Sequence, residues 1–168
     1  TRFARADWGE IDSRTGKVTV QRVPTREGTE ICPGPAGAKE WNHAAFSRDT
    51  GLLYAPILDR CAVFRSDEPE FKESMPYWGG GARITAEPRG GFVKAFDPMT
   101  GAEVWSWSAE HAIVSSILAT GGGIIFVGRP TGELVALDSS TGAQLWEFQT
   151  GSGIHGSPIT YCVDGKED

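Results

Sequence analysis

The chain has 168 residues, the length of one ordinary domain, with 22 glycines, 10 prolines, six tryptophans and only 23% charged residues. This composition suits many short strands joined by tight turns and argues against long helices. A net charge of −6 and an isoelectric point near 5.1 argue against nucleic acid as a partner, because no basic stripe is present to meet phosphates.

No apolar run in the sequence is long enough for a membrane helix. The longest candidate, residues 113–127, is interrupted by serines, a threonine and three glycines. Thr1 is not an initiator methionine, and the sequence starts abruptly within a strand-like pattern. We therefore expect a fragment or a processed chain.

Thr-Gly pairs at four places, 35 to 50 residues apart, are each typical of a hairpin turn. They occupy residues 15–16, 50–51, 100–101 and 141–142. In three of them an aspartate precedes the threonine by three residues: Asp12, Asp97 and Asp138. An aspartate accepts hydrogen bonds from backbone N–H groups two residues on, and the glycine takes the positive φ that a tight turn needs. We expect strands at 91–96 and 132–137, each leading into such a turn.

Residues 66–90 break this rhythm of turns. The stretch is rich in proline and glycine and contains no copy of the turn motif. We expect an inserted loop on one face of the domain.

The last two hairpins repeat the motif A-x-D-x-x-T-G-x-x-x-W at an offset of 41 residues. The matched pairs are Ala95/Ala136, Asp97/Asp138, Thr100/Thr141, Gly101/Gly142 and Trp105/Trp146. A period near 40 predicts an all-β propeller, with the tryptophan packed between neighbouring blades. At about 40–45 residues per blade the chain holds roughly three to four blades, too few to close a ring. We therefore expect a partial β-propeller that is stable only with its missing blades.

Three cysteines, Cys32, Cys61 and Cys162, form no CxxC pair and have no histidine cluster beside them, which makes a zinc site improbable. One disulfide and one leftover thiol are the simplest interpretation in an oxidising compartment. The three histidines, His43, His111 and His155, are scattered, and we expect them to be ordinary packed or surface residues. No Ser/His/Asp constellation is present, and residues 120–123, T-G-G-G, are typical of a hairpin turn.

Three features together resemble the quinoprotein dehydrogenases, the eight-bladed propellers that bind pyrroloquinoline quinone (PQQ). They are the tryptophan repeat, the segment from I31-C-P-G to Y54-A-P56, and the segment L118-A-T-G-G-G-I-I-F-V-G128 with the later G151-S-G-I-H-G-S-P-I-T-Y161. The resemblance runs from about residue 8 to 166 and is weakest around 62–88. It implies the C-terminal part of such a propeller.

The resemblance also implies a disulfide between Cys32 and Cys61. Its loop of about 30 residues would contribute about 3–4 kcal/mol by chain entropy. The alternative is a pair of buried free thiols. Cys162 would stay unpaired within this chain, and a periplasmic or secreted location would follow.

The stretch K39-E-W-N42 matches the family's Asn-Trp pair near the quinone. The resemblance implies cofactor contacts from Glu40, Trp41 and Asn42, with Trp41 walling the pocket. Glu40 stands where most relatives have asparagine, and a carboxylate beside the three carboxylates of PQQ is repulsive unless a metal, a cation or a proton compensates it. Either Glu40 acts differently or Asn42 serves instead. The alternative is that Trp41 is an inter-blade core residue and Glu40 faces solvent.

A second departure concerns Val114, where some methanol-oxidising relatives place a tryptophan over the substrate pocket. The smaller side chain suggests a roomier pocket and a substrate other than methanol. An ordinary strand explains the same residues.

As the resemblance implies, the complete enzyme would oxidise alcohols to aldehydes with PQQ and a calcium or lanthanide ion, passing electrons to cytochrome c or a quinone. The catalytic aspartate and the metal ligands would lie upstream, so we assign no catalytic or metal residue here and expect the chain alone to be inactive. Two alternatives stay open. One is a non-catalytic propeller acting as a protein-assembly scaffold, and the other is a degenerate dehydrogenase without PQQ.

Overall fold

The computed structural model describes residues 3–76, 79–85, 90–164 and 166–167. All secondary-structure elements in this part of the chain are β-strands, which confirms the all-β prediction. No helix there is long and apolar enough to cross a membrane. The chain divides into two compact units, one of residues 39–57 and 90–168 and the other of residues 2–38 and 58–89.

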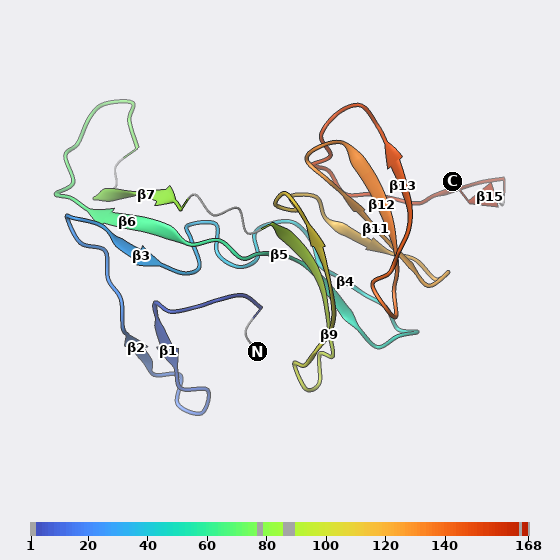
Figure 1. Cartoon of the computed structure of the whole chain (residues 1–168), viewed down its shortest axis with the longest axis horizontal. Helices are drawn as coiled ribbons and strands as arrows, with labels where there is room; N and C mark the ends of the chain where they lie inside the picture. Colours follow the sequence, from blue (N-terminus) through green and yellow to red (C-terminus); the bar gives the residue numbers. More distant parts are fainter. Residues whose placement is uncertain (1–2, 77–78, 86–89, 165, 168) are drawn as a thin grey trace. The chain divides into compact units, whose positions relative to one another are not determined.

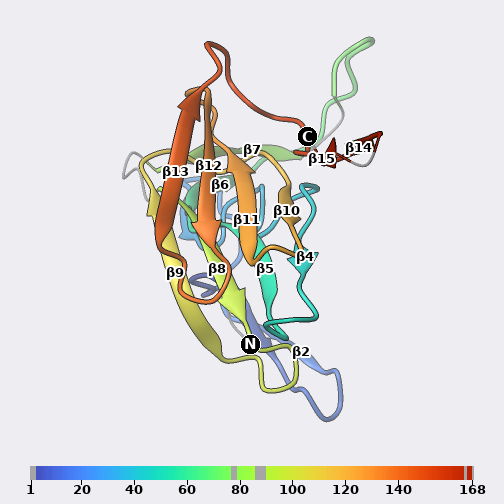
Figure 2. The same ribbon diagram turned by 90° about the vertical axis from the view of Figure 1, so that its right-hand side faces the viewer.

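The first unit contains two four-stranded sheets (Figures 1 and 2). One sheet has the order β4 (Ala45–Phe46), β5 (Leu53–Leu58), β8 (Gly91–Phe96) and β9 (Glu103–Ala109). The other is an antiparallel meander of β10 (Ile117–Ala119), β11 (Ile124–Gly128), β12 (Glu133–Asp138) and β13 (Gln144–Gln149). Strands were expected at 91–96 and 132–137, and β8 and β12 confirm both.

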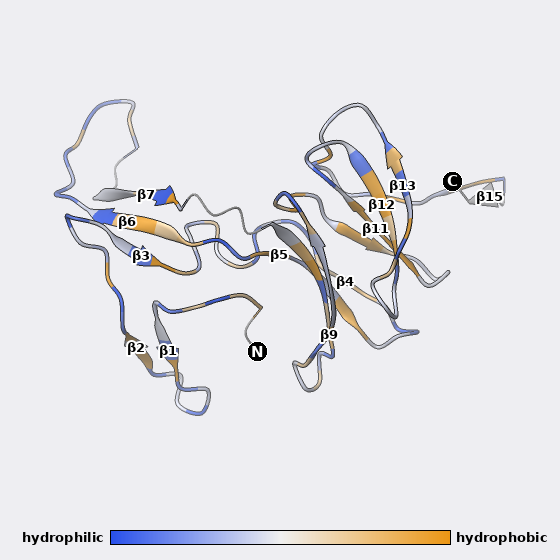
Figure 3. Ribbon diagram, viewed as in Figure 1, coloured by the Kyte–Doolittle hydropathy of each residue, from blue (hydrophilic) through white to orange (hydrophobic). Residues whose placement is uncertain are grey.

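Alternate residues of these strands meet in one core between the two sheets. Val93 and Ala95 of β8 are fully buried and alternate with half-buried residues, the period-2 pattern of a strand with one buried face. In β12, Val135, Ala136 and Leu137 are all buried. Hydrophobic colouring is accordingly strong along β11 and β12 in Figure 3. The remaining members of the core cluster are Tyr54, Trp105, Ala109, Ile113, Ile117, Ile125 and Val127.

The repeated turns have the geometry that the motif predicts. Asp138 Oδ1 accepts hydrogen bonds from the backbone N–H of Ser140 (2.9 Å) and of Thr141 (2.8 Å), and from the Thr141 hydroxyl (2.9 Å). Gly142 then turns the chain with φ of 73°. The turns that follow Asp12 and Asp97 use the same side-chain acceptor.

Trp105 explains why the motif repeats at this spacing. Its indole Nε1 donates to the carbonyl oxygen of Ser139, at 3.0 Å, in the Asp138–Gly142 turn of the next sheet. A Cβ at Gly142 would lie 2.5 Å from Trp105 Cε3, so the turn must be glycine where the ring packs on it. The predicted position of the tryptophan between blades is therefore confirmed for Trp105. Trp146, at the same motif position in the second sheet, is 47% exposed and stacks on Phe148.

These turns should make stability fall in acid. The Thr141 hydroxyl and the backbone N–H groups of Thr141 and Ser140 lower the pKa of the Asp138 carboxyl. A lowered folded-state pKa means that its stabilising contribution is complete above the unfolded value, about 3.9, and disappears as pH falls through the folded value. We expect Asp138→Asn, which keeps one acceptor oxygen and loses the charge, to lower the urea midpoint at pH 7. The gap to the unsubstituted protein should shrink below about pH 4. A gap independent of pH would contradict this account.

Thr50 and Gly51 do not mark a separate blade. Their turn joins β4 to β5, and Thr100–Gly101 joins β8 to β9 of the same sheet. In place of aspartate, Ser47 Oγ accepts from the Thr50 backbone N–H at 3.4 Å. Spacing between Thr-Gly pairs therefore does not count blades directly. The described residues contain two complete four-stranded sheets.

The second unit contains a hairpin and a three-stranded sheet. β1 (Gly9–Ile11) and β2 (Val18–Val20) flank the Asp12 turn, and β6 (Ala62–Ser66) lies between β3 (Thr29–Ile31) and β7 (Gly80–Ile84). The expected inserted loop at 66–90 therefore includes a strand, β7, paired with β6. Residues 77–78 and 86–89 of that loop lie outside the described residues.

In the first unit, β14 (Cys162–Val163) pairs with β15 (Lys166–Glu167).

Candidate functional site

Two segments, residues 39–43 and 113–117, lie side by side in the first unit. The first leads into β4 and the second into β10, which are the first strands of the two sheets. The His43 backbone N–H donates to Ser116 Oγ at 2.9 Å, and the Ile117 N–H donates to the His43 carbonyl oxygen at 3.1 Å. The candidate pocket wall is the surface formed by these two segments.

Asn42 is the buried joint between the segments. Its side chain is 2% exposed, and Nδ2 donates to the carbonyl oxygens of Ile113 (3.2 Å) and Ser115 (3.1 Å). Within the described residues its Oδ1 is buried and accepts no hydrogen bond. The amide N–H groups of Asn42 are thus committed to the protein, so Asn42 does not offer them to a cofactor.

Trp41 points away from the core that the described residues form. It is 65% exposed, whereas Trp105 of the tryptophan repeat is 9% exposed. Trp41 is therefore not packed between the two described sheets. An exposed indole beside a fixed backbone is instead suited to stacking or walling a flat ligand.

Glu40 is exposed, and among the residues that the structure describes its carboxylate accepts a hydrogen bond only from its neighbour. Oε2 lies 3.3 Å from the Trp41 backbone nitrogen. No cation pairs with this carboxylate among the residues described. The ammonium group of Lys39 donates to two backbone carbonyl oxygens, those of Glu40 (3.0 Å) and Asn42 (2.6 Å). Lys39 therefore places a positive charge in the same turn, and its two hydrogen bonds hold the turn closed.

Ser115 fixes the other segment and was not singled out by the sequence analysis. Its buried hydroxyl accepts from the Gly128 N–H at 2.8 Å and donates to the Gly128 carbonyl oxygen at 2.9 Å, tying the segment to β11. Val114, the residue expected over the substrate pocket, is half-buried in this segment. The sequence signal for these contacts is the pair of adjacent serines between apolar residues, because buried hydroxyl groups need hydrogen-bond partners.

The remaining candidates lie in ordinary surroundings. His43, His111 and His155 are exposed, and the closest contact of the His43 ring is a 3.5 Å approach of Nδ1 to Ser116 Oγ. A cleft of about 650 Å³ lies in the second unit beside β6 and β7. Its lining combines the cations Arg65, Lys72 and Arg83 with the anions Asp67, Glu68 and Glu70, so it favours no single ligand charge.

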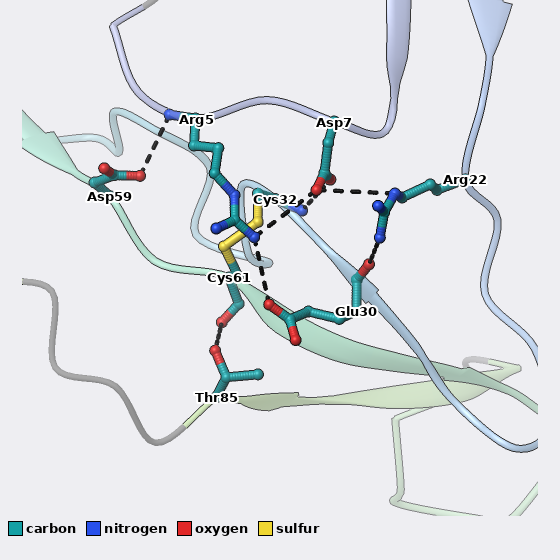
Figure 4. Close-up of a disulfide and its surroundings, with 8 residues drawn as sticks. All are labelled: Arg5, Asp7, Arg22, Glu30, Cys32, Asp59, Cys61 and Thr85. Atoms are coloured by element: carbon teal, nitrogen blue, oxygen red, sulfur yellow. Dashed lines mark hydrogen bonds and ion pairs between the residues drawn. A yellow bond between two sulfur atoms is a disulfide. The ribbon is translucent and has the colours of Figure 1, made fainter.

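The predicted disulfide between Cys32 and Cys61 is present, with 4.4 Å between the two Cα atoms (Figure 4). Both cysteines are buried, and Cys162 is free and exposed, as expected. Asp7 supports this bridge: its Oδ1 accepts from the Cys32 N–H at 2.7 Å, and Arg22 lies 3.8 Å from its Oδ2. The disulfide uses both sulfur atoms, so neither is left to bind a metal with the nearby Glu30.

Relatives of known activity match most of the chain. A quinoprotein ethanol dehydrogenase of Pseudomonas putida is 39% identical over 140 residues, which are 82% of this chain and 22% of that protein. A lanthanide-dependent methanol dehydrogenase of Methylacidiphilum fumariolicum is 31% identical over 98% of this chain and 29% of its own length. A family model described as "Outer membrane protein assembly factor BamB" matches residues 89–163.

Solved structures of alcohol and methanol dehydrogenases also match the chain. A europium-containing methanol dehydrogenase superposes with a TM-score of 0.89 at 30% identity, covering 98% of this chain and 31% of that one. The quinohemoprotein alcohol dehydrogenase of Comamonas testosteroni gives 0.84 at 29% identity, covering 99% and 27%.

The sheets, the docked tryptophan and these matches define a segment of a quinoprotein-type β-propeller. Most of the chain is similar to quinoprotein alcohol dehydrogenases, and it spans about a quarter of the length of the relatives it matches.

Proposed function

We propose that this chain is the C-terminal part of a PQQ-dependent alcohol dehydrogenase and forms one wall of its cofactor pocket. The observation that supports this most directly is the exposed Trp41, held beside residues 113–117 by the buried Asn42. An aromatic side chain exposed on a rigid turn fits one face of a flat tricyclic quinone. Glu40 fits less well, because PQQ is itself anionic.

When bound, PQQ would supply the electron acceptor for oxidation of an alcohol to an aldehyde, with a calcium or lanthanide ion as Lewis acid. The residues of this chain would contribute orientation and exclusion of water. Trp41 would cover the quinone plane and Val114 would border the alcohol. The catalytic base and the metal ligands would come from other parts of the complete protein, as would contacts to cytochrome c or a quinone.

The buried Cys32–Cys61 disulfide supports a periplasmic or secreted location, since such bridges persist in oxidising compartments. The second candidate function is a scaffold for protein assembly. It is favoured by the family model matching 89–163, which covers the tryptophan repeats that both kinds of propeller share. That match excludes residues 39–43, whereas the dehydrogenase relatives cover 82–98% of the chain. We therefore prefer the dehydrogenase.

The PQQ content of the native protein that contains this chain tests the proposal. The protein is denatured in acid and the released quinone is counted per polypeptide. A ratio near one supports a quinoprotein. The absence of PQQ after incubation with the cofactor and calcium or lanthanum would favour the scaffold or a degenerate dehydrogenase.

Glu40→Asn should tighten PQQ binding by roughly tenfold and weaken its dependence on salt, because it removes a like charge close to the quinone carboxylates. Binding is measured by titrating the PQQ-free protein at two ionic strengths. Asp49→Asn is the matched control, since it removes the same charge from the exposed turn between β4 and β5. Weaker binding of PQQ and metal in Glu40→Asn would instead make Glu40 a ligand.

A further inference from the structure

The backbone of residues 39–42 is held from two sides. On one side Lys39 Nζ donates to the carbonyl oxygens of Glu40 and Asn42, closing the turn on itself. On the other side Asn42 Nδ2 donates to the carbonyl oxygens of Ile113 and Ser115 on the segment that precedes β10. All four acceptors are backbone atoms, so these contacts determine where the chain runs.

The contrast in exposure within the turn is the key observation. Asn42 is 2% exposed and Trp41, its neighbour, is 65% exposed. The hydrogen bonds of the Asn42 side chain fix the backbone next to Trp41, and on this fixed backbone the Trp41 side chain is left exposed. An exposed tryptophan has few contacts of its own, and its position therefore depends on the anchored neighbour.

We infer that Lys39 and Asn42 are positioning residues that form a clamp, which holds the backbone of Trp41 beside the segment 113–117 and thereby sets the affinity for the quinone. The clamp acts through Trp41 and touches no cofactor itself. Its effect on the quinone rests on the proposed function. The anchoring of the turn does not, and it is measurable without PQQ.

The clamp also joins the two sheets at this end of the core. Asn42 belongs to the segment that enters β4, and its acceptors belong to the segment that enters β10. The Ser115 hydroxyl then connects the second segment to β11 through Gly128. A displacement of the second sheet would thus move Trp41 with it, so Trp41 and the segment 113–117 keep their spacing.

The first test uses hydrogen exchange of the native protein without added PQQ. Asn42→Ala removes both bonds to residues 113 and 115 and should speed exchange of the His43 and Ile117 amides at least about tenfold. Tyr54→Phe is the matched control, because it removes a partly buried hydrogen bond of the same sheet, between the Tyr54 hydroxyl and Thr50 Oγ1 at 2.6 Å. It should leave those two amides unchanged. Unchanged exchange in Asn42→Ala overturns the clamp.

The second test is a double-mutant cycle on PQQ affinity in the full-length protein. Asn42→Ala should weaken binding by about tenfold when Trp41 is present and have little further effect in Trp41→Ala. Lys39→Met should behave in the same way, and Lys39→Arg, which keeps donors, should restore part of the affinity. Equal losses in both backgrounds would overturn action through Trp41. A native protein that takes up no PQQ overturns the proposed function, and the exchange result then decides the clamp alone.

Discussion

Trp105→Ala is expected to lower the free energy of unfolding of the protein by about 3–5 kcal/mol, the range for a large aromatic removed from a core. The indole is 9% exposed, lies 5.7 Å from the Tyr54 ring between centroids, and donates to Ser139 in the next sheet. Its loss therefore leaves a cavity between the sheets and an unpaired carbonyl oxygen. Urea unfolding followed by far-UV circular dichroism measures the change. Met99→Ala, which alters a 90% exposed residue of a nearby turn, should cost little.

Gly142 provides a second, independent check of this docking. Gly142→Ala should destabilise the protein, since the new Cβ meets the Trp105 ring and φ of 73° disfavours a side chain. In Trp105→Ala the steric part of that cost should disappear, leaving the backbone part. The two substitutions should therefore be non-additive by about 1 kcal/mol or more. Strict additivity would mean that the ring does not rest on the glycine.

The repeat in the sequence predicted the sheets and their contact because one residue type serves two purposes. Glycine at 142 provides the positive φ of the turn and the bare surface on which Trp105 packs. Both requirements meet at Gly142, and the motif spacing places that glycine opposite Trp105. The alternation of buried and half-buried residues along most of β8 follows from the same two-sheet core.

Features that depend on distant partners were less accessible from the sequence. The turn at Thr50–Gly51 has the same two residues as the repeat, but its place between the first two strands of a sheet is decided by pairing with β8, which follows more than 30 residues later. Likewise Asn42 looked equivalent to its neighbours as a cofactor contact. Its burial follows from carbonyl oxygens 71 and 73 residues away, and no local pattern announces them.

Removal of the Cys32–Cys61 disulfide is the other change with a large expected effect. The Cys32→Ser/Cys61→Ser double variant should lose about 3–4 kcal/mol of stability, because a closed loop of about 30 residues restricts the unfolded chain. The bridge joins the end of β3 to the residue before β6. Thr85, the residue after β7, also donates from its hydroxyl to the Cys61 carbonyl oxygen at 3.2 Å. The end of β7 should therefore lose order as well.

Urea midpoints with and without dithiothreitol measure this loss. The reductant should lower the midpoint of the unsubstituted protein to that of the double variant and leave the variant unchanged. Cys162→Ser is the matched control, since that thiol is free and exposed and its replacement should change stability by less than about 0.5 kcal/mol. Amide exchange at Cys32, whose N–H is bonded to Asp7, locates the effect. A midpoint insensitive to reductant, with this amide still protected, would mean that β3 and β6 hold the second unit together without the covalent link.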